Sequence, residues 1–441
     1  MAFNEEQFKA IKAEFEIDGE HLQEIAASFR QDLQLGLRDV SLSSMRMLKS
    51  YVGLPSGKET GEYLALDFGG TNIRVFRIRL DGDGKYEIIK RVGRPLIVPG
   101  EYDYICKDAT AEQMFDFIAE LIDEAIDGDH DTKYYLGHTF SFPSTQDNLY
   151  NARLIIWTKE FATQGVEGEV ANDLLVAALK RRGAENVVPV AVLNDTVAVL
   201  LSAAYKTPNI FIGSIYATGH NTCYLESSIH DPNGVGFGGM ILNLECGNFM
   251  KLMPNRFDRE YDEGSEKPGE QRFEKMVSGR YMGELLGMAI AELLGEKGKK
   301  YGLTSIDMSM MVLDDSENLI KASDIMVTAV FDPILPNRIY CIQQSLFSVN
   351  IHSLYSQSVY LDRPFIFGSG HSRNVNKSAK YIADLLKLKT SGSIPGQRKI
   401  LFRSLLSLRV IPVCSFFMLV CIPILLCHRG PSLCIGIALL T

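Results

Sequence analysis

Asp67 and the small residues after it form the first group in this chain whose types and spacing could do chemistry. The stretch 64–78 predicts a strand, a tight turn and a second strand, with Asp67 where the first strand ends. Gly69-Gly70 can take positive φ and let a ligand approach the backbone. Backbone N–H groups of the turn, with the Thr71 hydroxyl and the Asn72 amide, can hold phosphate oxygens. Asp67 is placed to hold the waters of a Mg²⁺ ion, which usually stays hydrated in proteins.

A plain hairpin is the alternative interpretation, and a bare Gly-Gly-Thr would favour it. The fuller pattern Asp-x-Gly-Gly-Thr-x-x-Arg ends at Arg74 and favours phosphate binding, because nearly every fixed position has a role. A second strand, Gly/Thr/Asn turn and strand follow at 210–226, with a weaker glycine content. The two hairpins together predict two lobes that offer phosphate-binding turns to one nucleotide between them.

Asp195 is the second candidate, and it follows an apolar strand predicted at 190–193. Open α/β sheets place ligand chemistry at the carboxyl ends of their strands, and we expect this strand to be central in its sheet. Asn194 and Asp195 also suit the N-cap of the helix expected from 198 to 205. Both roles can hold at once.

Polar residues also follow two other apolar stretches. Ser141 comes after a strand predicted at 135–140, and Thr158 and Lys159 end a strand predicted at 154–161. Each loop alone is usually structural, although a position facing a cleft suits both.

Two carboxylates and one histidine give weaker signals. Glu245 ends a strand, and Glu274 lies on a helix that we expect to run from 268 to 294. A lone carboxylate on such an element is usually just solvated. We expect His138 to be a packed histidine rather than a catalyst or a ligand.

The elements that would position these groups follow from the spacing of apolar residues. Helices are expected within 4–48, with a break at Asp18-Gly19, and at 111–126 and 169–182. The turn 81–84, Asp-Gly-Asp-Gly, predicts that the first hairpin continues into an antiparallel meander.

The bulk composition bounds the class of protein. The chain has 441 residues, enough for two domains, and its 46% apolar and 22% charged residues are ordinary for a globular protein. A net charge of −9 argues against nucleic acid as the main partner. Eight cysteines without a Cys-x-x-Cys pair predict free thiols in a reducing compartment. The first residues have no basic start followed by an apolar run, so we expect no secretory signal and a cytoplasmic location.

The tail differs from the rest of the chain. No Asp or Glu follows Asp384, and residues 410–427 are almost wholly apolar. At about eighteen residues this stretch reaches the lower limit for a membrane span. Pro412 and Pro423 argue against a span, so membrane contact is less favoured than a buried strand and helix of a second lobe, or a sequence that has lost its usual ending.

Taken together and in order, these motifs resemble those of the eukaryotic hexokinases, from about residue 22 to about residue 294. Their joint occurrence is specific, although each piece alone is not. The matching stretches are 66–75 (first phosphate motif), Phe140-Ser141-Phe142-Pro143 and Trp157-Thr158-Lys159 (sugar loops), Leu193-Asn194-Asp195-Thr196 (catalytic motif), 218–224 (second phosphate motif), and Glu245 with 268–275 (large-lobe sugar contacts).

The resemblance implies an α/β fold, the two-lobed actin-like ATPase (ribonuclease H-like) architecture with a deep cleft between the lobes. It implies an N-terminal region, 1–204, with the first helices and the small lobe, and a C-terminal region, 205–441, with the large lobe. The implied reaction is transfer of the γ-phosphoryl of Mg-ATP to the 6-hydroxyl of glucose, or of a hexose such as mannose or fructose, as in the first step of glycolysis.

The resemblance also implies a role for each matching residue. Asp195 would take the proton of the attacking hydroxyl as general base, and Lys159 would lend positive charge beside it. Mg²⁺ would be held by Asp67 through water. The implied sugar contacts are Ser141, Phe142, Thr158, Lys159, Asn194, Asp195, Asn221, Glu245, Gln271 and Glu274, and the implied ATP contacts are Asp67, Phe68, Gly69, Gly70, Thr71, Asn72, Arg74 and Thr218.

Three positions depart from the family pattern. Ala217 stands for a glycine of the second phosphate motif, and Cys246 stands where a tryptophan often lies beside the sugar glutamate. Gly368-Ser369-Gly370 only partly matches the adenosine-side signature. A sugar-binding regulatory protein with little turnover is therefore one alternative to an active hexokinase. An ATPase of the actin/chaperone type is another, but it leaves Trp157-Thr158-Lys159 unexplained.

Overall fold

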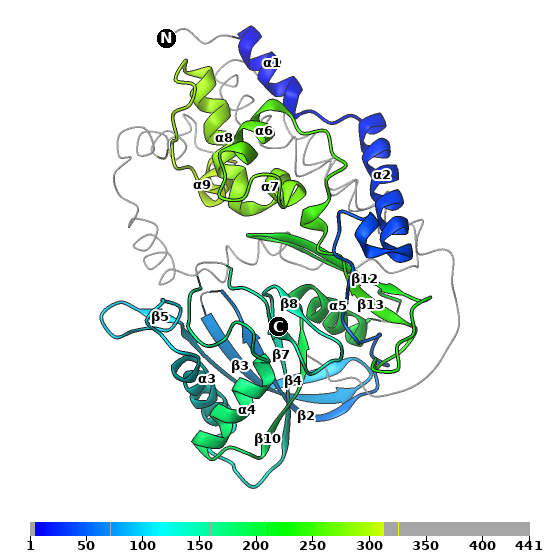
Figure 1. Ribbon diagram of the computed structural model, residues 1–441, viewed down its shortest axis with the longest axis vertical. Coiled ribbons are helices and arrows are strands. Elements are labelled where there is room, and N and C mark those ends of the chain that lie inside the picture. Colours follow the sequence, from blue (N-terminus) through cyan, green and yellow to red (C-terminus); the bar gives the residue numbers. More distant parts are fainter. Residues whose placement is uncertain (1–4, 71, 159–160, 208, 313–324, 326–441) are drawn as a thin grey trace, which may run out of the picture.

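The computed structural model describes residues 5–70, 72–158, 161–207, 209–312 and 325, and the fold is described for these residues. They form two main sheets with helices between and around them (Figure 1). The apolar tail and the turn at 368–370 lie outside the described residues. Within the described part of the chain, every helix is too short or too polar to cross a membrane.

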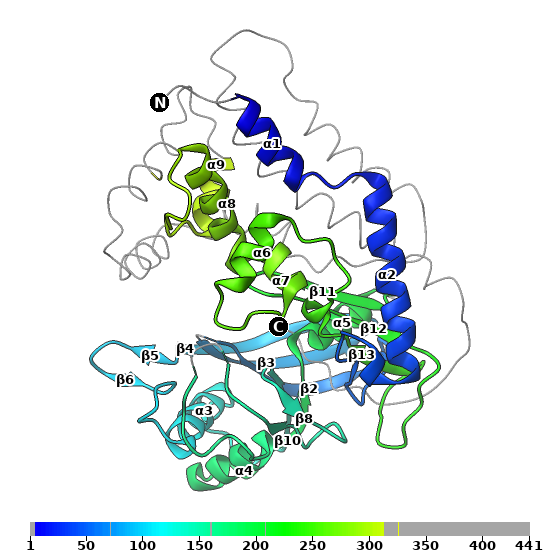
Figure 2. The ribbon, with the colours of Figure 1, turned by 45° about the horizontal axis from the view of Figure 1, so that its top comes forward.

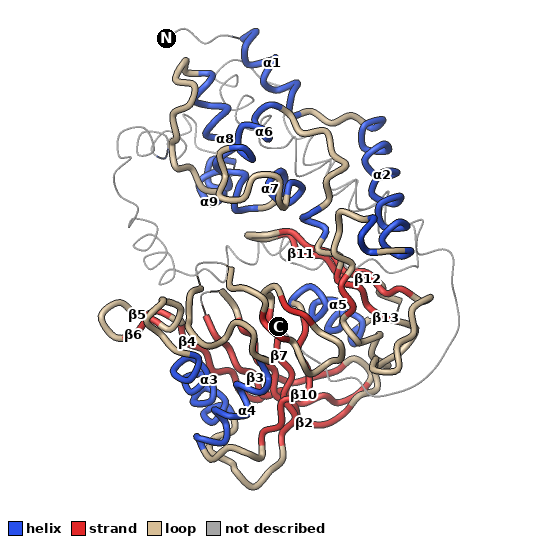
Figure 3. The backbone as a smooth tube through the Cα atoms, viewed as in Figure 1, coloured by secondary structure: helices blue, strands red, loops and turns tan. Residues whose placement is uncertain are grey.

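The first sheet has five strands in the order β10-β7-β2-β3-β4 (Figure 3). β2, β3 and β4 form the expected antiparallel meander, whereas β7 is parallel to both β2 and β10. β10 is the edge strand of this sheet, so the prediction that the strand before Asp195 is central is wrong. The strands are β2 (Thr60–Phe68), β3 (Asn72–Gly82), β4 (Lys85–Pro95), β7 (Tyr134–Phe140) and β10 (Val187–Leu193).

The parallel pairing brings the carboxyl ends of β2, β7 and β10 to one edge of this sheet. Asp67 on β2 pairs with Thr139 on β7, which in turn pairs with Leu193 on β10. Residues that follow these strands, Ser141 and Asp195 among them, therefore emerge beside Asp67. The parallel register of β2, β7 and β10 gathers these side chains, although β10 lies at an edge of the sheet.

Helices cover both faces of the first sheet. α3 (Ala111–Ala125) and α4 (Ala171–Arg182) pack on the face that carries Leu64 and Leu66. α5 (Asp195–Lys206) packs on the other face, which carries Ala65, and also on the second sheet (Figure 2). α5 therefore connects the two sheets, and its first residue is Asp195.

The second sheet is antiparallel, with the order β1-β13-β12-β11. The second predicted hairpin is β11-β12, so its strands are confirmed. The strands are β1 (Leu48–Lys49), β11 (Ile212–Tyr216), β12 (His220–Glu226) and β13 (Met240–Asn243).

The two N-terminal helices pack against elements that follow residue 205. α1 (Glu5–Phe15) and α2 (Gly19–Arg38) are separated at Asp18, as expected, and the Asp18 side chain caps α2. Phe29 of α2 joins the core under the second sheet, and Ile11 of α1 joins α6 and α8. Both helices lie on that side of the molecule, away from α3 and α4 (Figure 2).

The helix expected from 268 to 294 is two helices, α7 (Arg272–Val277) and α8 (Gly279–Leu293). Ser278 between them is extended, with φ −87° and ψ 158°, so the chain changes direction there. A Cβ on Gly279 would lie 2.7 Å from the Ala217 carbonyl oxygen, so glycine allows α8 to begin against the second hairpin. The other helices of this region are α6 (Arg256–Glu263) and α9 (Ser305–Val312).

The strand expected at 154–161 is wrong, because only β9 (Arg153–Leu154) is extended there and it pairs with β8 (Ser144–Thr145). The described residues after it wrap around Trp157 instead. The main-chain N–H of Trp157 donates to Glu167, and its indole N–H donates to the Thr163 carbonyl. The remaining short elements are η1 (Val40–Leu42), β5 (Ile97–Val98), β6 (Tyr102–Asp103) and η2 (Cys246–Asn248).

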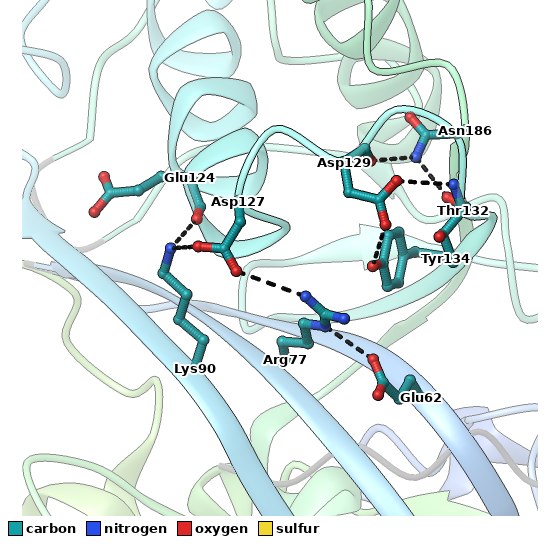
Figure 4. A network of polar contacts seen from close by, with 9 residues as sticks. All are labelled: Glu62, Arg77, Lys90, Glu124, Asp127, Asp129, Thr132, Tyr134 and Asn186. Carbon is teal, nitrogen blue, oxygen red and sulfur yellow. Dashed lines mark hydrogen bonds and ion pairs between the residues drawn. The ribbon is translucent and has the colours of Figure 1, made fainter.

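A polar network closes the opposite edge of the first sheet, at the amino ends of its parallel strands (Figure 4). Arg77 on β3 bonds Glu62 on β2 at 2.8 Å, and Lys90 on β4 reaches Asp127 after α3. Asp129 accepts hydrogen bonds from Thr132 and Tyr134, and the Thr132 bonds lower its pKa. These contacts fix the end of the sheet that has no part in the site described below.

Candidate active site

The first hairpin is held by a charge pair across its strands. Arg74 Nη1 lies 2.8 Å from Asp67 Oδ2, and the two residues are direct partners in the β2-β3 register. The Thr139 hydroxyl makes a longer contact, 3.4 Å, with Asp67 Oδ1. Asp67 and Arg74 therefore lie together as expected, at the carboxyl edge of the sheet.

Gly69 has a different use from the one predicted. Its φ is not in the left-handed region, so the expected positive φ is wrong at this position. Its N–H donates to the Asn72 carbonyl at 3.2 Å, and a Cβ would lie 2.9 Å from that oxygen. Glycine is needed here for close approach within a tight turn. Thr71 lies outside the described residues.

The same corner fits a hydrated Mg²⁺ ion, which needs few protein carboxylates when water and phosphate supply the other ligands. Asp67 is half-buried, and among the described residues its Oδ1 has a long contact with the Thr139 hydroxyl. Within the described ranges, no three His, Cys, Asp or Glu side chains are grouped so that they could hold an ion directly. The donor set therefore fits an ion held through water at Asp67.

Aromatic side chains support the loops around this edge. Phe142 packs against Trp157 with ring centroids 4.7 Å apart, and against Phe68 at 5.8 Å. Phe68 and Phe142 are buried, so only their main-chain atoms can contact a ligand. Thr158 follows Trp157 and is half-buried, while Lys159 lies outside the described residues.

Asp195 is held by one hydrogen bond of its main chain and one of its side chain. Its N–H donates to the Ser141 hydroxyl at 3.1 Å, and its Oδ1 accepts the Thr196 N–H at 2.8 Å. Asn194 is the N-cap of α5, with its Oδ1 also accepting the Thr196 N–H. The predicted cap is therefore confirmed for Asn194, and it places Asp195, the first residue of α5, at the carboxyl edge of the sheet.

Asn221 carries the polar network across to the second sheet. Its Nδ2 lies 2.7 Å from Asn243 Oδ1, 3.2 Å from Glu245 Oε1 and 3.5 Å from Asn194 Oδ1. Asn243 Nδ2 donates to the same Glu245 oxygen at 2.8 Å. The prediction missed Asn243, although its place two residues before Glu245 at a strand end was a usable signal.

Glu245 is a half-buried residue on an unusual backbone. Its φ of 49° and ψ of 48° lie in the left-handed region, which glycine favours and glutamate rarely adopts. Burial raises its pKa, and the nearby negative charges of Asp195 and Glu274 act in the same direction. Such a carboxylate is stabilised by every further hydrogen-bond donor, and the hydroxyl groups of a ligand are donors of this kind.

Glu274 contacts the turn of the second hairpin. Its Oε2 accepts the His220 N–H at 2.9 Å, and a Cβ on Gly219 would lie 2.8 Å from that oxygen. The carbonyls of Ala217 and Thr218 accept the first N–H groups of α8, at 2.8 and 3.0 Å. The second turn is thus held by α7 and α8.

The structure brings most of the predicted sugar contacts together. Ser141, Asn194, Asp195, Asn221 and Glu245 form one hydrogen-bonded set, with Glu274 in electrostatic reach of Glu245. Carboxylates and amides in this arrangement suit a ligand with several hydroxyl groups. Gln271, by contrast, is exposed at the start of α7, and its side chain makes no hydrogen bond to another described residue. His138, as expected, is packed: it is buried beside Asn172, and burial lowers its pKa to about 4.

The chain is similar in sequence and in structure to known hexokinases. A family model described as Hexokinase matches residues 7–205, and a second one, also described as Hexokinase, matches 211–345. The hexokinase of Schistosoma mansoni is 37% identical over 313 residues, which cover 67% of this chain and 68% of that protein. The structure described as hexokinase from Schistosoma mansoni complexed with glucose superposes with a TM-score of 0.61 and 32% identity, over 75% of this chain and 78% of that one.

Mammalian relatives are longer. Hexokinase-2 of Rattus norvegicus is 39% identical over 294 residues, which cover 63% of this chain and 32% of that protein. Hexokinase HKDC1 of Homo sapiens is 38% identical over 299 residues, which cover 65% of this chain and 32% of that protein. The chain therefore matches about a third of the length of these relatives.

Proposed function

The chain belongs to the hexokinase family, and on that premise we propose that it transfers the γ-phosphoryl group of ATP to the 6-hydroxyl of glucose or a related hexose. One observation carries the proposal. The Asp195 carboxylate lies at the start of α5, in the hydrogen-bonded set that joins Asn194, Asn221 and Glu245. A base beside several hydroxyl-binding groups is what selective activation of one sugar hydroxyl requires.

Asp195 takes the proton of the attacking 6-hydroxyl in this proposal. Its backbone is held by Ser141, and within the described residues its Oδ2 has no hydrogen-bond partner, so this oxygen is the one to face the hydroxyl. Lys159 supplies positive charge near the transferred group, as the sequence resemblance implies. Positioning and charge neutralisation are the main requirements of phosphoryl transfer.

The remaining hydroxyls of the hexose are held by the second sheet and the loops. Glu245 and Glu274 accept hydrogen bonds from hydroxyl groups, and the amides of Asn194 and Asn221 can donate as well as accept. A hexose that lacks one of these hydroxyls leaves a buried polar group unpaired, which gives selectivity. Ser141, Thr158, Gln271 and the main chain of Phe142 complete the proposed contacts.

ATP is placed between the two hairpins in this proposal. The turn from Gly69 to Asn72, with Thr218 of the second hairpin, holds the phosphates, while Asp67 orients the water shell of Mg²⁺. When bound, the ion neutralises phosphate charge. The N-terminal region, 1–204, would hold the first helices and the small lobe, the C-terminal region, 205–441, would hold the large lobe, and the compartment would be the cytoplasm.

The test is turnover of the full chain with glucose, mannose and fructose, next to Asp195→Asn. We expect the variant to lose about 10²–10⁴-fold in kcat, the usual size of general-base catalysis. Glucose binding should persist in the variant, followed by fluorescence of Trp157, the only tryptophan in the chain. Asp116→Asn, which removes an exposed ion pair with Arg181 on the far face of α3, is the matched control.

Two results would contradict the proposal. Glucose-dependent stabilisation of the wild type without formation of glucose 6-phosphate would favour a sugar-binding regulatory protein. ATP hydrolysis that no hexose changes would favour an ATPase.

A further inference from the structure

His220 lies in the second hairpin with contacts that the proposed reaction does not use. His220 is 2% exposed, and its imidazole packs at a tilt against Tyr216, with ring centroids 3.9 Å apart, and meets Phe273 edge-on at 5.1 Å. Nδ1 lies 3.1 Å from the Ile215 carbonyl, and Nε2 lies 3.4 Å from Sγ of Cys246. The buried ring therefore has a partner at each nitrogen and packs against two aromatic rings.

These contacts connect His220 to both sugar carboxylates. Its main-chain N–H donates to Glu274 Oε2 at 2.9 Å, and its ring contacts Phe273, the residue before Glu274. Its Nε2 contacts Cys246, the residue after Glu245. One side chain thus touches the chain neighbour of each glutamate.

The pair of imidazole and thiol is neutral. A carbonyl can only accept, so Nδ1 carries the proton and Nε2 accepts from the Cys246 thiol. Burial lowers the pKa of His220 to about 3 and raises the pKa of the Cys246 thiol. A neutral thiol is a poor nucleophile, so this contact holds positions rather than doing chemistry.

We propose that His220 and Cys246 form a positioning pair that sets where the Glu245 and Glu274 carboxylates lie, and thereby the affinity for hexose. The inference rests on the proposed function, since it takes both glutamates as hexose contacts. Cys246 is fully buried with its sulfur 3.4 Å from the imidazole nitrogen, so a larger side chain at this position would have to displace His220 or its own backbone. The imidazole therefore accounts for cysteine at the position where the family often has tryptophan.

A double-mutant cycle on the full chain tests the pair. The four proteins are the wild type, His220→Ser, Cys246→Trp and the double variant, with glucose affinity measured by calorimetry in the absence of ATP. We expect each single variant to lose about tenfold or more in glucose affinity, and the double variant to return to within about threefold of the wild type, because contacting residues are coupled. In turnover, the KM for glucose should rise in the single variants more than kcat falls.

Smaller changes cover the case in which Cys246→Trp does not fold. His220→Phe keeps the ring stacking and the main-chain N–H but loses both nitrogen contacts, and Cys246→Ala removes the thiol. Both should weaken glucose binding severalfold. His138→Phe is the matched control, because this equally buried histidine lies in the first sheet, and it should lower stability without changing glucose affinity.

Two results would overturn the proposal of a positioning pair. One is a glucose affinity equal to that of the wild type in both His220→Phe and Cys246→Ala. The other is a loss of binding free energy in the double variant equal to the sum of the losses in His220→Ser and Cys246→Trp. A different result would refute the proposed function without refuting the positioning pair. A wild type that binds glucose without phosphorylating it would refute the reaction and still leave the binding data to decide on the pair.

Discussion

The two glycine-containing hairpins are held in different ways. The β2-β3 hairpin is stabilised by its own residues, with the Asp67–Arg74 ion pair across the strands and the Gly69 N–H bonded within the turn. The β11-β12 hairpin also has a bond within its turn, from the Ala217 N–H to the Gly219 carbonyl, but it is held from outside as well, since α8 donates to two of its carbonyls and His220 donates to Glu274 on α7. The first turn can therefore change without moving the sugar site, whereas the second turn is part of it.

The largest effect expected from a change in either turn comes from adding one methyl group to the second turn. Gly219→Ala places a Cβ 2.8 Å from Glu274 Oε2, which is too close for a carbon and an oxygen that are not bonded, so the carboxylate must move. A displacement of this kind costs about 10²-fold in kcat/KM for glucose. Steady-state kinetics with glucose varied at saturating ATP measures it.

Gly69→Ala is the matched change in the first turn. Its Cβ would meet the Asn72 carbonyl at 2.9 Å, so the turn itself must distort. We expect a higher KM for ATP with glucose affinity retained. If Gly69→Ala weakened glucose binding as much as Gly219→Ala does, the distinction between the two turns would be wrong.

The next effect is a dependence of stability on pH, which we expect from His138, the buried histidine of the first sheet. Burial lowers the pKa of His138 from 6.5 to about 4, so the folded protein resists its protonation. The stability that depends on neutral His138 is complete above pH 6.5 and is lost as the pH falls toward 4, by about 1.4 kcal/mol per pH unit. His138→Gln keeps a donor for Asn172 and removes this titration.

Denaturant unfolding of the wild type and His138→Gln between pH 7 and pH 5 measures the difference. The gap in unfolding free energy should shift in favour of the variant as the pH falls, while glucose affinity at pH 7 stays unchanged. Parallel curves for the two proteins would show that the imidazole is not kept neutral by the fold. His220, by contrast, cannot be replaced without a change in glucose affinity if the positioning pair is correct.

Most elements near the site could be predicted from the chain, because local patterns determine them. The strands of both hairpins, the helices around 111–126 and 169–182, and the cap at Asn194 are confirmed. Asn194 and Asp195 owe their place to one cap motif, and such a motif is readable in a sequence.

The errors concern tertiary contacts that no local pattern encodes. β10 is an edge strand because of sheet order, and the chain after 154 leaves the strand conformation because it wraps around Trp157. The break at Ser278 follows from the contact of Gly279 with the second hairpin. Asn243 was missed because its importance lies in partners on two other segments.

The ion pair of the first hairpin gives a smaller effect on stability. Arg74 and Asp67 side chains are 39% and 23% exposed, so Arg74→Ala should cost less than about 1 kcal/mol of folding free energy. The KM for ATP should nevertheless rise, because Asp67 loses the partner that orients it. Arg181→Ala, at a similarly exposed pair with Asp116, is the control and should leave both KM values unchanged. An effect of Arg74→Ala on glucose affinity instead of ATP would refute the separate roles of the two hairpins.

Restoring glycine at Ala217 should have the smallest effect. Ala217 does not have a positive φ, so the alanine is unstrained and glycine brings no relief. Its N–H and carbonyl are already bonded to Gly219 and to Gly279 of α8, and these contacts do not depend on the side chain. Ala217→Gly should therefore lower stability by only about 0.5 kcal/mol, through the entropy of the unfolded chain. The KM for ATP should stay within about threefold of the wild type. A tenfold gain in ATP affinity would instead show that the methyl group obstructs the phosphates, and the weakness of the second hairpin would then lie in this one residue.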